Sequence, residues 1–130
     1  MKMLVAYDGS TSALNALKTA VSYAKIFDAM IFVVTSLYGE HKDSREEIEK
    51  AEALLKDAEA VVKKEGIACE GHLLIRSMVP GEDTLRFAIE HRVDQIFIGI
   101  KHRSKVGKLL FGSNAQHVIL NAPCPVVTVR

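Results

Sequence analysis

Apolar residues along the chain fall alternately into short continuous runs and into stripes at helical spacing. The continuous runs lie within residues 3–7, 30–37, 68–76, 94–99 and 126–129. Runs of this length, bounded by turn residues, are typical of strands that are buried on both faces. We therefore predict five strands, the third with its apolar centre at Leu73, Leu74 and Ile75.

Two long helices are predicted in the first half of the chain. One follows the turn 8–12, which is rich in helix-capping residues, and ends near Phe27. The other spans 45–65, with an apolar stripe on one face, glutamates and lysines on the opposite face, and Gly66 at a C-cap-like position.

Two shorter helices are predicted in the second half. Pro80 is favoured in a first helical turn, and Glu82 and Asp83 suit the positive end of the helix dipole there. The last helix begins at 112–114 and ends before Pro123. The apolar positions expected to build these two helices are Leu85, Ala88 and Ile89 in the first, with Val118 and Ile119 on the inner face of the second.

Strands and helices thus alternate along the whole chain. Strands separated by helices imply right-handed parallel crossovers, so we predict an α/β fold with an open, doubly wound parallel sheet and helices on both of its faces. The 130 residues contain no linker, repeat or low-complexity tract, and any boundary would cut a strand–helix–strand unit. We therefore expect one domain over residues 1–130.

Composition narrows the classes of partner. Hydrophobic residues make up 48% of the chain, enough for a sizeable core, and the formal net charge of +1 gives no global drive towards nucleic acid or an anionic membrane. No signal peptide is expected, and no apolar run approaches the ~20 residues that span a bilayer. Cys69 and Cys124 are too few and too far apart for a disulfide framework, which predicts a cytoplasmic protein.

A ligand of such a sheet is expected beyond the carboxyl ends of the strands, where the strand order reverses. The turn after the first strand holds Asp8, which could accept hydrogen bonds from a ribose or an amino group or orient a metal. Asp8 could equally serve as a cap for the first helix, and both roles can hold together.

The loop after the fourth strand carries a second set of candidates. Gly99 would let a ligand approach the backbone closely, and Gly112 and Ser113 at a helix start form a plausible seat for phosphate. Basic residues surround this loop: Lys101, His102, Arg103, Lys105 and Lys108. Neither a Walker A motif nor a GxGxxG motif is present, which disfavours a P-loop protein and a dinucleotide-binding domain.

Catalytic signatures are weak throughout the chain. The five histidines lack metal-ligand spacing, and no serine lies in a GxSxG context. We therefore predict a binding protein and not an enzyme.

Three segments together resemble the universal stress protein family over essentially the whole chain. Residues 3–10 (MLVAYDGS) are similar to the family's first strand and acidic turn. Gly99-Ile100-Lys101-His102, nine further residues and Gly112-Ser113 resemble its nucleotide loop, G-x-x-G, nine residues, G-S/T. Residues 122–127 (APCPVV) are similar to its ending.

The resemblance implies strand order 3-2-1-4-5, a homodimer formed through the last strand, and binding of ATP or a related adenine nucleotide, with Mg²⁺ or Mn²⁺, without fast turnover. It implies that Ala6, Tyr7 and Ser36 lie near the base and that Asp8 contacts the ribose. The residues implied to contact ribose and phosphates are Gly99, Gly112, Ser113 and Asn114.

His102 departs from the pattern because it occupies the position of the second loop glycine. A histidine adds a ring where glycine leaves the backbone open, although its imidazole can donate to a phosphate or stack. This departure favours an alternative: a module of the same fold that binds partners or its own copy without nucleotide. A third class, a pyrophosphate-releasing enzyme of a related fold, lacks its HIGH-like or SGGxDS-like motif here.

Overall fold

A computed structural model describes residues 1–39, 44–100 and 112–130. Each of the nine predicted elements lies in these ranges, close to its predicted position. The elements are β1 (Lys2–Ala6), α1 (Thr11–Phe27), β2 (Met30–Ser36), α2 (Arg45–Lys64), β3 (Cys69–Leu74), α3 (Pro80–Glu90), β4 (Gln95–Gly99), α4 (Ser113–Asn121) and β5 (Val126–Val129).

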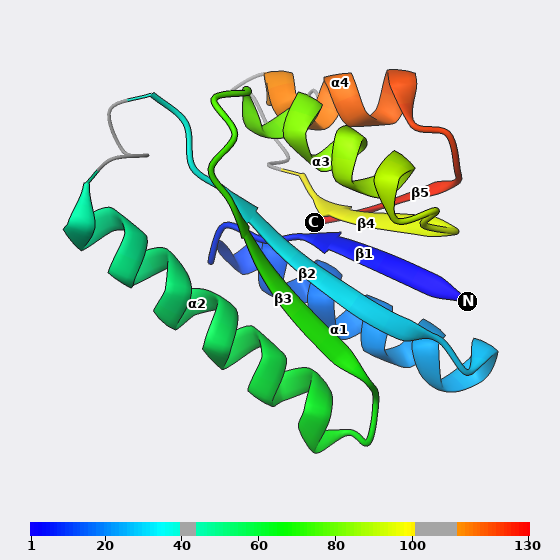
Figure 1. Cartoon of the computed structure of the whole chain (residues 1–130). Helices are drawn as coiled ribbons and strands as arrows, with labels where there is room; N and C mark the ends of the chain where they lie inside the picture. The colour runs from blue at the N-terminus through cyan, green and yellow to red at the C-terminus, as the bar shows by residue number, and fades with distance from the viewer. Residues whose placement is uncertain (40–43, 101–111) are drawn as a thin grey trace, which may run out of the picture.

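All five strands run parallel in one sheet of order β3-β2-β1-β4-β5, as Figure 1 shows. This confirms the predicted fold class and strand order. Val5 at the middle of β1 lies opposite Val33 of β2 and Phe97 of β4, so β1 is the central strand. The chain moves outward from β1 to β3 and then returns to the other side of β1, which places the switch point between β1 and β4.

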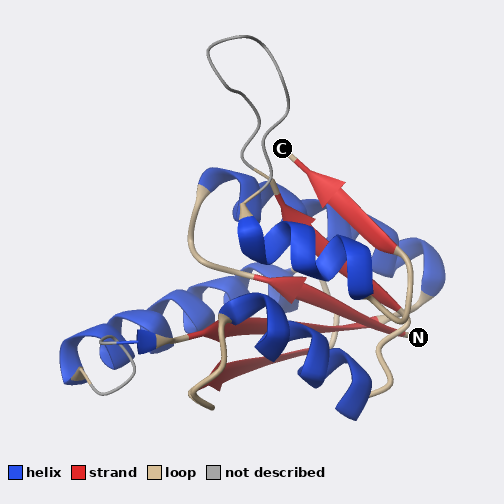
Figure 2. Ribbon diagram, turned by 90° about the horizontal axis from the view of Figure 1, so that it is seen from above, coloured by secondary structure: helices blue, strands red, loops and turns tan. Residues whose placement is uncertain are grey.

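Alternate residues of the strands build two separate cores. Met3 and Val5 face α1 and α2 on one side of the sheet, whereas Leu4 faces α3 and α4 on the other. The two pairs of helices are seen on opposite sides of the sheet in Figures 1 and 2. A sheet covered on both faces explains why its strands are apolar throughout.

Two apolar positions were predicted wrongly. Ile75 lies beyond the last residue of β3 and is 40% exposed, so it is not part of the strand centre. Ile119, predicted on the inner face of its helix, is 37% exposed, although Val118 beside it is buried. Ile89 lies in α3 as predicted and is also exposed, at 63%. A step of one residue rotates a side chain by ~100° around a helix, and each of these short helices buries only one stripe.

The two cysteines lie in different cores and are both free thiols. Cys69 packs on the α1–α2 side of the sheet and Cys124 on the α3–α4 side. In the part of the chain that the structure describes, no helix combines the length and the apolar character that crossing a membrane requires.

Candidate functional site

A cavity of about 370 Å³ opens at the carboxyl ends of β1, β2 and β4, beside the switch point. The N-terminal ends of α3 and α4 form its other wall. It is lined by every candidate residue that the structure describes: Ala6, Tyr7, Asp8, Ser36, Gly99, Gly112, Ser113 and Asn114. The remaining candidate, His102, and the basic residues around it lie outside the described residues.

The turn between β1 and α1 satisfies its own backbone. Asp8 Oδ1 accepts a hydrogen bond from the Ser10 amide at 2.9 Å, and Ser10 Oγ accepts one from the Ala13 amide at 3.2 Å. These contacts form a local turn followed by a capped helix N-terminus. Asp8 nevertheless remains exposed at the rim of the cavity, so a structural role leaves its outer carboxylate face accessible.

Tyr7 lines the cavity, and both of its backbone polar groups are hydrogen-bonded to β2. Its amide donates to Val34 O at 2.8 Å, and its carbonyl accepts from Thr35 Oγ1 at 2.7 Å. The ring packs against the core on the α1–α2 side. Burial, together with the nearby carboxylates of Asp57 and Asp8, raises the pKa of the Tyr7 phenol, so this group stays protonated at neutral pH.

The N-terminus of α4 differs from that of α1 because no side chain in the described residues caps it. Gly112 is the N-cap residue, with φ −62° and ψ 157°. A Cβ at this position would meet no described residue within 4 Å. Uncapped amides at a helix start can donate to an anion.

Asn114 joins the two helix ends that form the far wall. Its Oδ1 accepts a hydrogen bond from the Gly81 amide at 2.9 Å, which ties the start of α3 to the start of α4. The amide nitrogen of the same side chain is the group left to face a ligand.

Gly99 is required by packing within the chain. A Cβ there would lie 2.5 Å from the Ser12 carbonyl carbon and 2.7 Å from the Ala13 nitrogen, closer than real contacts allow. Glycine at the end of β4 thus admits the first turn of α1. The sequence-based explanation, close approach of a ligand, overlooked this neighbour.

Ser36 leads to a buried network that the sequence analysis missed. Its Oγ donates to Asp83 Oδ2 at 2.8 Å, and Arg76 Nε donates to Asp83 Oδ1 at 2.7 Å. Asp83 is completely buried and was interpreted only as an acidic residue at a helix N-terminus. Arg76 lies in the loop after β3 and Asp83 lies in α3. No sequence motif links the two positions, so their ion pair could not be predicted from the sequence.

Arg76 also joins this network to the surface. Its Nη1 donates to Glu90 Oε1 at 2.6 Å, and its Nη2 donates to the Asp83 backbone carbonyl at 3.2 Å. Burial by itself lowers the pKa of the guanidinium, but the hydrogen bonds to Glu90 and Asp83 outweigh it and raise this pKa. The hydrogen bond from Arg76 lowers the pKa of Glu90 in turn. Arg76 therefore stays charged beside Asp83.

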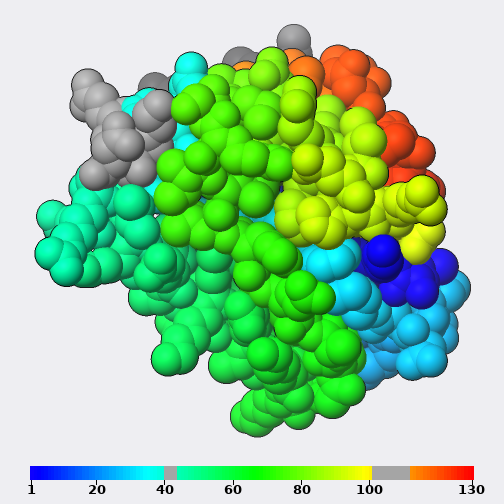
Figure 3. Space-filling model, in the orientation of Figure 1, coloured from blue at the N-terminus to red at the C-terminus, as the bar shows by residue number. Residues whose placement is uncertain are grey.

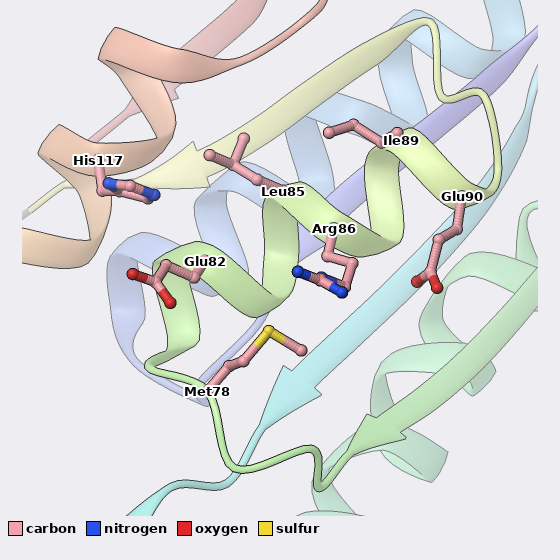
Figure 4. A pocket seen from close by; sticks show the side chains of 7 residues that line it. All are labelled: Met78, Glu82, Leu85, Arg86, Ile89, Glu90 and His117. Atoms are coloured by element: carbon pink, nitrogen blue, oxygen red, sulfur yellow. The ribbon is translucent and has the colours of Figure 1, made fainter.

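A second hollow, of about 530 Å³, lies on the outer side of α3 and contains none of the candidate residues. Figure 4 shows Glu82, Arg86 and Glu90 projecting from α3, with His117 of α4 at one end. In the space-filling view of Figure 3, α3 lies at the surface beside β3. This hollow is open and gathers no candidate residue, so the cavity at the strand ends is the better candidate site.

Metal-binding side chains do not gather in either place. Within residues 1–39, 44–100 and 112–130, no three side chains of histidine, cysteine, aspartate or glutamate are placed to hold an ion. Two or three such ligands are the usual minimum for a site built by protein alone.

Known proteins are similar to this chain in both sequence and fold. A model of the universal stress protein family matches residues 1–130. A universal stress protein of Thermus aquaticus is 34% identical over 137 aligned positions, which cover 98% of this chain and 97% of that protein.

Solved structures from Archaeoglobus fulgidus agree with the sequence comparison. A universal stress protein of that organism has a TM-score of 0.90 and 39% identity, with 100% of this chain and 98% of that chain covered. A structure described as the universal stress protein of the same organism in complex with dAMP has a TM-score of 0.86 and 35% identity, with the same coverage. This chain belongs to the universal stress protein family.

Proposed function

We propose that this chain binds ATP or a related adenine nucleotide in the cavity at the carboxyl ends of the strands, as a regulatory module of a stress response. The observation that carries the proposal is that every candidate nucleotide residue described by the structure lines this one cavity. Those residues come from four separate segments of the chain. The proposal is for binding, without fast turnover of the nucleotide.

The dimensions and chemistry of the cavity support this ligand. About 370 Å³ falls within the ~300–1,000 Å³ of common small-molecule sites. We place the base beside Ala6, Tyr7 and Ser36 and the ribose beside Asp8 and Gly99. In this arrangement the nucleotide runs from the end of β2 across the switch point towards α4.

The phosphates then reach the uncapped start of α4. The open backbone at Gly112 and the amides of Ser113 and Asn114 offer donors, and the helix dipole favours negative charge there. In the sequence, the basic residues between 101 and 108, His102 included, immediately precede this helix. A relative with 35% identity is described in complex with dAMP, which supports an adenine nucleotide as the ligand class.

Mg²⁺ or Mn²⁺ would enter with the nucleotide. Because the described residues offer no cluster of metal ligands, we expect the phosphates to supply most of the coordination. The protein would then contact the ion at most through single side chains such as Asp8.

Calorimetric titration with ATP, ADP and AMP, with and without Mg²⁺, tests this proposal. We expect measurable heat and a rise in melting temperature, together with NMR shifts at the amides of Gly99, Gly112 and Ser113. Amides of Arg86 and Ile89, in the hollow outside α3, serve as the control and should not move. Absence of heat and of thermal shift at millimolar nucleotide would overturn the proposal of binding. Rapid release of ADP or pyrophosphate would contradict the proposal that the nucleotide is not turned over quickly.

The edge strand β5 favours a second candidate function, an interaction module that forms a homodimer. Its residues are mostly half-buried in the isolated chain, and β4 is its only neighbour among the described strands. An apolar edge strand can pair with another chain. Light scattering after size exclusion, with and without ATP, tests this: a dimer supports pairing, whereas a strict monomer at every concentration contradicts it.

The two free cysteine thiols are relevant to where in the cell the protein is located. Cys69 and Cys124 sit in different cores, and burial raises the pKa of Cys69 to about 12. Such thiols need no oxidising environment, which supports a cytoplasmic location. Fractionation of cells that express the full chain tests this placement.

A further inference from the structure

Ser36 lines the cavity, and its hydroxyl has a fixed hydrogen-bonding direction. A serine hydroxyl has one hydrogen to donate and two lone pairs that accept. The hydrogen of Ser36 is directed to Asp83 Oδ2 at 2.8 Å. Only lone pairs are therefore left for a ligand in the cavity that Ser36 lines.

Asp83 enforces this direction from behind the cavity wall. Its side chain is completely buried and does not line the cavity itself. Its other oxygen accepts from Arg76 Nε at 2.7 Å, and an ionised carboxylate can only accept hydrogen bonds. Arg76 also donates to the Asp83 backbone carbonyl, so the carboxylate is held in one orientation. The hydroxyl of Ser36 must then donate inward.

We propose that Asp83 is a positioning residue that sets the base preference of the site, by making Ser36 a hydrogen-bond acceptor for the 6-amino group of adenine. This inference rests on the proposed function, which places the base beside Ser36. A 6-oxo purine would bring its own acceptor against the lone pairs of Ser36. The site therefore selects 6-amino over 6-oxo purine nucleotides through a residue that never touches the ligand.

The wild-type test compares AMP with IMP, which keep the same ribose and phosphate and differ at the 6-position and N1 of the purine. We expect AMP to bind about tenfold more tightly than IMP in calorimetric titrations, the size of effect expected when one buried hydrogen bond is replaced by two opposed acceptors. Purine riboside monophosphate, which has no 6-substituent, should bind with intermediate affinity.

Asp83→Asn reverses the direction of the hydrogen bond. The amide oxygen of asparagine can still accept from Arg76 Nε, which turns the amide nitrogen towards Ser36 Oγ as a donor. The hydroxyl hydrogen of Ser36 is then free to point into the cavity. We expect AMP to bind about tenfold more weakly, IMP to bind more tightly than to wild type, and the AMP-to-IMP preference to fall to one or below.

Two further variants keep the test decisive if Asp83→Asn fails to fold in a thermal melt. Ser36→Ala removes the acceptor and should reduce the AMP-to-IMP preference to about one. Glu90→Gln is the matched control because it also removes one negative charge that contacts Arg76, yet it leaves the Ser36–Asp83 bond in place. This control should keep the wild-type preference.

The outcomes separate the inference from the proposed function. If neither AMP nor IMP binds the wild type, the proposed function fails and the inference fails with it. If both bind equally well, or if Ser36→Ala and a folded Asp83→Asn keep the preference for AMP, nucleotide binding stands and the role of Asp83 is overturned. Loss of the preference for AMP in Glu90→Gln would also contradict the role of Asp83, because it would show that the preference depends on the charge around Arg76.

Discussion

The turn from β1 into α1 and the backbone leading into α4 border the same cavity, but their helix N-termini are completed in different ways. Ser10 caps α1 with its own hydroxyl, and Asp8 closes the turn in front of it. Gly112 at the start of α4 has no side chain to offer, and no described residue replaces it. One turn is complete within the chain, whereas the other leaves donors for a ligand.

The difference shows that one helix start in this fold can stabilise the protein while another remains available to a ligand. A closed turn adds stability because its polar groups are already paired. An open helix start gives up that stabilisation and keeps amides and a positive dipole end free for an anion. Gly99 connects the two, since its lack of a Cβ lets the first turn of α1 rest on the end of β4.

The largest effect is expected from Gly99→Ala, which drives the closed turn away from β4. Its Cβ would collide with the backbone of Ser12 and Ala13, and we expect the free energy of unfolding to fall by about 3 kcal/mol. Urea denaturation measures this loss. Gly112→Ala is the matched control: its Cβ meets none of the described residues within 4 Å, and the stability of this variant should stay within about 1 kcal/mol of wild type. Equal losses in both variants would contradict the comparison.

Gly112→Asp gives the open helix start a cap of its own and should move stability and binding in opposite directions. The carboxylate can accept from the first-turn amides and suits the dipole, so stability should rise by about 0.5 kcal/mol. The same charge repels phosphate, and we expect ATP affinity to fall by roughly 10- to 100-fold. Denaturation and calorimetry on one preparation measure both changes. Unchanged ATP affinity would show that phosphate does not bind here.

Ser10→Ala opens the closed turn and should cost stability alone. It removes the hydroxyl that accepts from the Ala13 amide, and loss of such a cap costs about 1 kcal/mol. ATP affinity should change by less than about twofold, because the cap bond lies within the chain. A fall in affinity larger than the fall in stability would show that this turn also binds through Ser10.

Asp8→Asn is expected to have the smallest effect on folding. Asparagine can still accept from the Ser10 amide, so the turn should persist with stability within about 0.5 kcal/mol of wild type. Loss of the charge weakens hydrogen bonds to ribose hydroxyls, and we expect AMP affinity to fall about threefold to tenfold. Calorimetry with AMP measures it. An unchanged affinity would limit Asp8 to its structural role.

Much of the fold could be predicted because its signals are local. Apolar runs and helical stripes fixed the order of the elements, and the sheet order agreed with the family resemblance. Errors arose where a residue fits the apolar pattern of the sequence but is not buried in the structure. Ile75 and Ile119 are as apolar as core residues, but only the packing of α4 and the end of β3 decide that they face solvent.

The candidate site was predicted only in part for the same physical reason. Turn glycines, Asp8 and the start of α4 carry recognisable chemistry in sequence, and the structure brings them to one cavity. Asp83 carries no such signal, because a buried carboxylate looks in sequence like any acidic residue in a first helical turn. Its partners Ser36 and Arg76 lie 47 and 7 residues away along the chain.

By itself, the sequence determined the alternation of strands and helices, the family, and the residue types at the strand ends, since these depend on periodicity and on short motifs. The tertiary structure decided why Gly99 must be glycine, which helix start stays uncapped, and which way the hydroxyl of Ser36 points. These properties depend on contacts between segments far apart in the chain, and such contacts exist only once the sheet has brought those segments together.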